Sequence, residues 1–170
     1  MPNNYDLPEK EYYPTPQESI KGLFEIIDFK NLVEEGFTFA EPCKGEASAI
    51  YQHFPKGSEY CEIQEGKDYL DSSWDKNPDI IITNPPFSLA VPFLIKSMEE
   101  SSVQIYLLKL AFLESKGRHK FNKANPPDHL IIMSKRPSFV GGGTDKAPYA
   151  WFIYDRKGVL GLQKPFYFIL

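Results

Sequence analysis

The sequence predicts an α/β fold in which a mostly parallel β-sheet carries an antiparallel hairpin at its C-terminal end. Through most of the 170-residue chain, runs of β-branched and aromatic residues alternate with segments of helical periodicity, as in βαβ units. The last apolar runs follow one another closely, and short connections of this kind suit antiparallel strands rather than parallel crossovers. A chain of this length suits a single domain, here residues 1–170.

The expected elements follow from periodicity and from residues that stop helices or strands. Residues 1–12 are polar and contain prolines, which predicts an N-terminal arm. Within 17–36, Ile20, Leu23 and Ile27 recur at helical spacing, and Gly36 is the expected stop. Strands are expected at 37–42, 58–63, 67–70, the start of 80–88, 103–113, 129–134, 149–155 and 166–170, and helical segments at the end of 43–54, at 89–101 and at 114–125.

Charge and composition narrow the classes of function. The net charge of −4 and the pI near 5.4 argue against strong autonomous binding of nucleic acid, although basic residues gather within 108–136. No apolar stretch is long enough to span a bilayer, and the N-terminus lacks the order of a signal peptide. We therefore expect a cytoplasmic protein, without membrane association, whose two cysteines Cys43 and Cys61 are reduced.

Acidic residues follow three of the predicted strands where a ligand is expected. Ligands of parallel α/β sheets bind outside the carboxyl ends of the strands. Glu41 would repel a pyrophosphate but suits an ammonium or a sulfonium. Glu62 suits ribose hydroxyls, and Asp68 suits an adenine amino group. With neither a P-loop nor a G-x-G-x-x-G motif present, this set favours S-adenosylmethionine over NAD, although each carboxylate taken alone could equally be a solvated loop charge.

The residues Asn84–Phe87, "NPPF", follow a β-branched strand, and their two consecutive prolines make the backbone at its end stiff. An exocyclic amine conjugated to an aromatic ring is a poor nucleophile, and two fixed acceptors would localise its lone pair. The Asn84 side-chain oxygen and the Pro85 carbonyl can serve as these acceptors, with Pro86 adding rigidity. Phe87 offers a face on which an extruded base can stack. A second Asn-Pro-Pro, at 125–128, lacks both the strand and the aromatic residue, which predicts a plain loop.

These residues resemble the amino-group methyltransferases of DNA, in particular the short adenine-N6 enzymes encoded by phages and prophages. The likeness runs over nearly the whole chain and is most specific at "NPPF". It implies a Rossmann-like S-adenosylmethionine-dependent methyltransferase fold, S-adenosylmethionine as cofactor, and DNA with a flipped-out adenine as substrate. The catalytic residues implied are Asn84, Pro85, Pro86 and Phe87. The cofactor-binding residues implied are Tyr13, Pro14, Thr15, Glu41, Pro42, Cys43, Gly45, Ala47, Glu62, Asp68, Tyr69 and Asn84.

The chain also departs from this family. Ala47 replaces a second glycine of the cofactor loop, and no insertion is long enough for a separate target-recognition domain. Sequence specificity would then be poor, or come from the loop 138–148, from a homodimer or from a protein partner. Lys109, Arg118 and Arg136 are candidates for contacts with a nucleic-acid backbone, with a solvated basic surface as the alternative. The histidines do not cluster at metal-ligand spacing, so no metal site is expected.

Two other functions remain compatible with the sequence. The same chemistry could act on an RNA adenine or on a protein glutamine amide, whose nitrogen is also conjugated and weakly nucleophilic. Alternatively, the chain could be a catalytically silent binding protein that retains a methyltransferase-like fold; the intact Asn84, Pro85 and Phe87 weigh against this.

Overall fold

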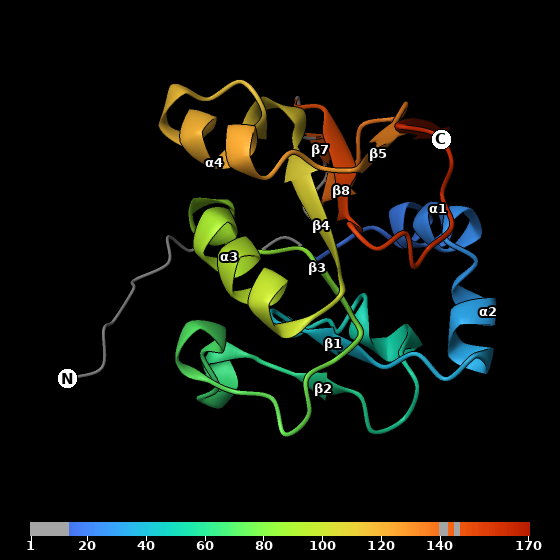
Figure 1. The fold of residues 1–170 in the computed structure, drawn as a ribbon, viewed down its shortest axis with the longest axis vertical. Helices are drawn as coiled ribbons and strands as arrows, with labels where there is room; N and C mark the ends of the chain where they lie inside the picture. The colour runs from blue at the N-terminus through green and yellow to red at the C-terminus, as the bar shows by residue number, and fades with distance from the viewer. Residues whose placement is uncertain (1–13, 140–142, 145–146) are drawn as a thin grey trace.

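A seven-stranded β-sheet forms the centre of the molecule, with strand order β2-β1-β3-β4-β8-β5-β9 (Figure 1). The computed structural model describes residues 14–139, 143–144 and 147–170. The strands of this sheet are β1 (Phe39–Glu41), β2 (Glu59–Tyr60), β3 (Ile80–Thr83), β4 (Val103–Lys109), β5 (His129–Met133), β8 (Tyr149–Tyr154) and β9 (Phe166–Ile169), and β6 (Ser138–Phe139) pairs separately with β7 (Gly143–Thr144).

The sheet is parallel through its first half and mixed through its second. Strands β2, β1, β3 and β4 are parallel to one another. Strand β8 is antiparallel to both β4 and β5, so it lies between them, and β9 pairs in parallel with β5 at the outer edge. The prediction of a mostly parallel α/β sheet with an antiparallel pair near the C-terminal end is therefore confirmed. The pair is inserted into the sheet, however, whereas the short connections had suggested addition at one edge.

Helices cover both faces of the sheet (Figure 1). On one face, α1 (Gln17–Ile26) and α2 (Phe29–Glu34) bury apolar side chains against Ile80, Ile82 and Trp151. On the other face, α3 (Ala90–Glu100) packs against Ile81 and Tyr106, and the short α4 (His119–Ala124) follows beyond it. Burial of the continuous isoleucine run on both faces is what the centre of a parallel sheet requires. No helix in the described ranges has the length and apolar character needed to cross a bilayer.

Several predicted elements differ in the structure. The strand expected over 103–113 ends at Lys109, where a 3₁₀ turn over Leu110–Phe112 begins. The helix expected over 17–36 is broken at Asp28, whose φ of 50° is left-handed and whose carboxylate caps the start of α2 at Asn31. The helix expected at the end of 43–54 is a 3₁₀ turn over Tyr51–His53. The strand expected at 67–70 is not formed, because Asp68 caps a 3₁₀ turn over Tyr69–Asp71 and only Lys67 bridges back to Glu62.

Candidate active site

The carboxyl ends of the parallel strands bring the predicted site residues to one edge of the sheet. Glu41 is the last residue of β1, Glu62 lies two residues beyond β2, and Asn84 follows β3 directly. Because β3 pairs with both β1 and β4, Asn84 lies near the middle of this edge. The sheet therefore places the two acids and the amide side by side, as the sequence predicted.

Glu41 is a buried carboxylate with an unfilled acceptor position. It has 1% of its surface exposed, and its Oε2 has no hydrogen-bond partner among the residues that the structure describes. Burial raises the pKa of this carboxyl well above its ordinary value, while the backbone N–H of Tyr51 lowers it and the nearby Glu62 raises it further. An acid in this position gains most from a cationic group that can donate to Oε2.

The loop after β1 is held in place by Glu62. The Glu62 Oε2 accepts a hydrogen bond of 2.6 Å from the backbone N–H of Gly45, and Oε1 accepts one of 3.1 Å from Gln64. Gly45 has a φ of 68°, a left-handed conformation that favours glycine. Since a carboxylate can accept about four hydrogen bonds, Glu62 keeps capacity for a ligand hydroxyl while it fixes the loop.

Lys44, in the same loop, points away from the two acids. Its Nζ lies 2.9 Å from Oε1 of Glu65 and 4.2 Å from the centre of the Tyr60 ring. Its backbone N–H donates to the Cys61 carbonyl, which prolongs the contact between the β1 and β2 segments. Its charge is the smallest of the influences on the pKa of Glu41, which it lowers.

Asn84–Phe87 form a rigid turn between β3 and α3. Thr83, the last residue of β3, is fully buried, and Pro85 and Pro86 are buried after it. The Pro86 carbonyl accepts from the N–H of Leu89 at 2.9 Å, which closes a 3₁₀ turn that leads into α3. The Pro86 carbonyl is therefore committed to the fold, and the substrate-facing role expected of the Pro85 carbonyl stays a prediction.

The Asn84 side chain is fixed by the segment that precedes α1. Its Nδ2 donates to Oγ1 of Thr15 at 3.1 Å, although the two residues are 69 positions apart in the sequence. The sequence singled out Thr15 as a cofactor contact, and its link to Asn84 had no signal in the sequence. Pro14 is half-buried next to it, and Tyr13 lies outside the described residues.

Phe87 lies in an aromatic and cationic cluster at the mouth of the site. Its ring centre is 5.8 Å from that of Tyr149, which is fully buried on β8. The Lys109 Nζ lies 5.2 Å from the centre of the Phe87 ring and 5.9 Å from that of Tyr149. Sequence reasoning assigned Tyr149 to the core and missed its contact with Phe87, because nothing in the sequence pairs the two residues.

Both cysteines are held as thiols in this region. Burial, reinforced by the charges of Glu41 and Glu62, raises the pKa of Cys43 to about 12. Burial also raises the pKa of Cys61 to about 11. Because a thiolate rather than a thiol is the nucleophile, neither side chain is available for covalent catalysis at neutral pH.

The other predicted cofactor residues lie in the loop after β1 and at the start of the 3₁₀ turn Tyr69–Asp71. Pro42 lies buried and Ala47 exposed in the loop after β1. Asp68 is half-buried and accepts from the N–H of Leu70 at 3.0 Å. Tyr69 is 2% exposed, packs on Phe93, and donates its hydroxyl proton to Glu100 at 2.7 Å. This arrangement leaves only the Tyr69 backbone for a cofactor, and a role for its side chain stays a prediction without support from its position.

The predicted basic residues differ in how they are held. The Arg118 Nε donates to the Phe112 carbonyl at 3.1 Å and its guanidinium lies 4.8 Å from the Phe112 ring centre, so Arg118 stabilises the turn before α4. Arg136 is exposed next to β6. Part of the predicted specificity loop, residues 140–142 and 145–146, lies outside the described residues. Within the ranges that the structure describes, no group of three or more His, Cys, Asp or Glu side chains could hold a metal ion.

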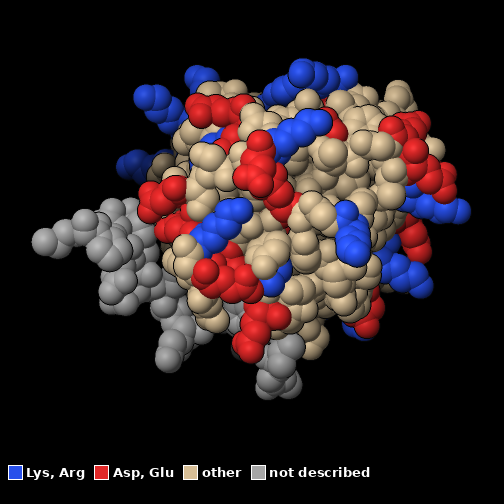
Figure 2. Space-filling view, turned by 90° about the horizontal axis from the view of Figure 1, so that it is seen from below, with Lys and Arg blue, Asp and Glu red and all other residues tan. Residues whose placement is uncertain are grey.

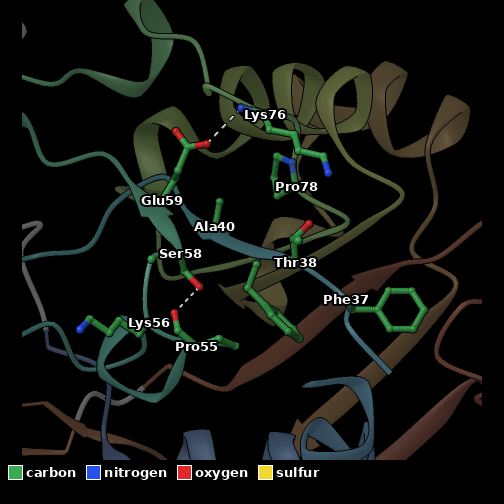
Figure 3. Close-up of a pocket in the computed structure, with 11 residues that line it drawn as sticks. Phe37, Thr38, Ala40, Pro55, Lys56, Ser58, Glu59, Lys76 and Pro78 are labelled. Atoms are coloured by element: carbon green, nitrogen blue, oxygen red, sulfur yellow. Dashed lines mark hydrogen bonds between the residues drawn. The ribbon is translucent and has the colours of Figure 1, made fainter. Parts of the chain in front are cut away.

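A separate pocket of about 250 Å³ lies at the opposite end of β1 and β2 (Figure 3). Its rim is tied by hydrogen bonds from the Lys76 N–H to Glu59 at 3.2 Å and from the Ser58 hydroxyl to the Pro55 carbonyl at 2.7 Å. Because it lies towards the amino ends of these strands, with Thr38 and Ala40 in its wall, it is distinct from the edge that carries Glu41 and Asn84.

Solved structures share this architecture. A Pyrococcus horikoshii RNA methyltransferase matches with a TM-score of 0.62 at 16% identity, covering 85% of this chain and 86% of that chain. A class I S-adenosylmethionine-dependent methyltransferase from Listeria monocytogenes matches with a TM-score of 0.57 at 14% identity, covering 91% of this chain and 64% of that one.

A modification subunit of a type I restriction enzyme from Vibrio vulnificus matches with a TM-score of 0.53 at 15% identity, covering 87% of this chain and 45% of that one. The activities named for all three proteins are provisional assignments. No protein-family model and no curated protein matches the sequence. The chain has the class I methyltransferase fold. The predicted fold class is thereby confirmed, and at these identities the likeness concerns the fold alone.

Proposed function

We propose that the chain is an S-adenosylmethionine-dependent methyltransferase that transfers a methyl group to the exocyclic N6 amino group of adenine in DNA. The observation that carries this proposal is Asn84: its carboxamide follows the central strand β3 and is fixed by Thr15 on the edge that also carries the buried Glu41. The environments of Glu41, of the two cysteines and of Phe87 also support this chemistry.

The fit of the cofactor rests on Glu41. Its Oε2 is buried and has no partner among the described residues, and the ammonium of a methionine moiety would supply both the missing hydrogen bond and a compensating charge. Glu62 and Asp68 are the acceptors proposed for the ribose hydroxyls and the adenine amino group. S-adenosylmethionine, when bound, supplies a methyl group that is activated by its sulfonium.

The Asn84 turn acts on the acceptor nitrogen. An exocyclic amine on an aromatic ring shares its lone pair with the ring. Hydrogen bonds from its two N–H groups to Asn84 Oδ1 and the Pro85 carbonyl favour a tetrahedral nitrogen, whose lone pair is then available for attack. Because the buried prolines fix both acceptors before the substrate binds, little reorganisation is needed at the transition state.

The cysteines favour an amine over a ring carbon as the methyl acceptor. Methylation of a pyrimidine carbon needs a thiolate that adds to the ring. Cys43 and Cys61 are the two cysteines of the chain, and their raised pKa values keep them protonated at neutral pH. Methylation of an amine needs no covalent nucleophile, so the available groups suit that reaction.

Phe87 and Lys109 favour a nucleic acid over a protein amide. The Phe87 ring offers a stacking face for a base, and the Lys109 ammonium lies within reach of that face. A flipped nucleotide brings a phosphate with it, which Lys109 can pair with. On the face in Figure 2, however, basic and acidic side chains are interspersed rather than gathered into one basic surface. We therefore expect weak autonomous binding of the polymer and specificity that comes from a partner or a second copy.

An RNA acceptor is the second candidate. The structural likeness to the Pyrococcus horikoshii protein, which is named as an RNA methyltransferase, favours it. The test is transfer of labelled methyl from S-adenosylmethionine to unmethylated DNA, matched RNA and a glutamine-containing protein, assayed side by side. Label in DNA at least tenfold above that in RNA and protein is expected. Label only in RNA would support the second candidate. Cofactor binding without any transfer would mean that the acceptor is wrong or a partner is missing, and no cofactor binding at all would support a silent binding protein.

A further inference from the structure

A buried hydrogen bond joins the catalytic turn to the segment in front of α1. The Asn84 Nδ2 donates to Oγ1 of Thr15 at 3.1 Å, and 6% of the Thr15 surface is exposed. Because Thr15 is buried, water has little access to this bond and competes with it only weakly.

Thr15 is held rigidly with respect to the sheet. Prolines flank it on both sides, and the Pro16 carbonyl accepts from the N–H groups of Ser19 and Ile20 at the start of α1. The Ser19 carbonyl in turn accepts from the indole Nε1 of Trp151, a fully buried side chain of β8, at 3.1 Å. The hydrogen bond to Asn84 thus connects two proline-stiffened segments, and one of them is anchored to the sheet.

In the observed arrangement the Nδ2 end of the Asn84 carboxamide faces Thr15. A carboxamide has an oxygen that accepts and an NH₂ group that donates, on opposite sides of Cγ. With Nδ2 bound to Thr15, Oδ1 is directed to the other side. A reversed carboxamide would present its NH₂ group to the N–H groups of an amine, so two donors would oppose each other and the acceptor would be lost.

We propose that Thr15 is a positioning residue whose hydroxyl, by accepting from Nδ2, holds the Asn84 carboxamide in a fixed place with Oδ1 on the side of the acceptor amine. This inference rests on the proposed function of Asn84. Thr15 then acts on the rate of transfer through Asn84, rather than as a contact of the cofactor.

The variants Thr15→Val and Thr15→Ser separate these roles. Valine keeps the shape of threonine and removes the hydrogen bond, whereas serine keeps the hydroxyl. In Thr15→Val we expect kcat at saturating cofactor to fall roughly 3- to 10-fold, which corresponds to one hydrogen bond. The Kd for S-adenosylmethionine, measured by calorimetry, stays within about twofold of wild type on the same argument. Thr15→Ser restores most of kcat.

Other outcomes distinguish the possible failures. If Thr15→Val weakens cofactor binding and leaves kcat at saturation unchanged, Thr15 is a cofactor contact and the inference is wrong. If the wild-type chain transfers no methyl group to any acceptor, the proposed function itself fails, and the contact between Thr15 and Asn84 is then tested without activity.

That second readout is proton exchange of the Asn84 side-chain amide, followed by ¹⁵N NMR and assigned through the signal that disappears in Asn84→Asp. Exchange is expected to be faster in Thr15→Val and unchanged in Thr15→Ser, because only the valine variant loses the acceptor. Equal exchange in wild type and Thr15→Val would overturn the inference.

Discussion

The two Asn-Pro-Pro segments of this chain share three residues and lie at opposite edges of the sheet. Asn84 follows β3 at the carboxyl edge, where its side chain is bound by Thr15 from a distant segment. Asn125 ends α4 before β5, at the amino edge, and both its N–H and its Nδ2 donate to the carbonyl of Phe121 within its own helix.

The following residues diverge in the same way. Around the second segment, the Pro126 carbonyl accepts from Arg156 at 2.7 Å, and Asp128 accepts from the N–H of Asp155 at 2.7 Å and pairs with Arg156. These groups tie the start of β5 to the end of β8 and are committed to the fold. The comparison teaches that the edge of the sheet, and not the tripeptide alone, decides which segments hold these side chains.

Replacing each asparagine by alanine tests the comparison with the largest expected effect. Asn84→Ala removes an acceptor that acts in the transition state, so kcat is expected to fall by about 10²–10³-fold while cofactor affinity is retained. Asn125→Ala is the matched control and should leave kcat unchanged. Equal losses of activity in both variants would contradict the assignment of the two edges.

Glu41→Gln sharpens the account of the carboxyl edge. Loss of the charged acceptor is expected to weaken S-adenosylmethionine binding by roughly 10- to 100-fold, as measured by calorimetry. Glu46→Gln, an exposed change in the same loop, is the control and should bind normally.

Glu41→Gln should also change the free energy of unfolding, and the sign of this change depends on pH. The pKa of Glu41 is raised in the folded chain, so the folded state holds this proton more tightly than the unfolded state does. Below the ordinary carboxyl pKa, Glu41 is protonated in both states and costs nothing. As the pH rises from there through the raised pKa, the wild-type free energy of unfolding falls. Glu41→Gln without cofactor should therefore be more stable than wild type at pH 8, by about 1–3 kcal/mol, and lose this advantage near pH 4.

Lys109 is the cation beside the first Asn-Pro-Pro segment, and we expect its removal to change how the KM for DNA depends on salt. If Lys109 pairs with a phosphate of the substrate, Lys109→Ala reduces the slope of log KM for DNA against log salt by about 0.7–0.9. Lys120→Ala, at an exposed position of α4, serves as the control. An unchanged slope in Lys109→Ala would remove Lys109 from the nucleic-acid interface.

Arg156→Ala has the smallest expected effect and concerns stability alone. Its side chain is 50% exposed, so the pair with Asp128 is screened by solvent, and its loss, with that of the bond to Pro126, should cost about 1 kcal/mol or less. Urea denaturation measures this cost. The kcat of Arg156→Ala should equal that of wild type. A loss of turnover would contradict the claim that residues at the amino edge of the sheet contribute to stability alone.

Local sequence patterns predicted the parallel core and the residues at the carboxyl edge of its strands, because both features depend on short-range signals. The β-branched run Ile80–Thr83 stops at two prolines, so strand, turn and catalytic candidates were all readable from nine residues. The strand at 67–70 failed because Asp68 satisfies the backbone locally as a cap, which competes with pairing in a sheet. The break at Asp28 was missed for the same reason, since a carboxylate cap there interrupts an otherwise continuous helical pattern.

Contacts between distant segments were beyond reach of such patterns. The bond between Thr15 and Asn84 spans 69 positions, and the contact of Phe87 with Tyr149 depends on the insertion of β8 between β4 and β5. Neither the order of the strands beyond β4 nor the residues that pair between those strands can be derived from periodicity. The unfilled acceptor of Glu41 likewise became visible only when the residues around it were in place.

The most direct test of the central claim is the identity of the methylated atom. Unmethylated DNA is incubated with the wild-type chain and labelled S-adenosylmethionine, digested to nucleosides and separated, with Asn84→Ala as the blank. The account predicts that the label elutes as N6-methyladenine and is lost in Asn84→Ala. Label recovered on a ring carbon, as in 5-methylcytosine, would contradict it, because the proposed acceptors activate an amine and the raised pKa values of Cys43 and Cys61 disfavour the thiolate that a carbon acceptor needs.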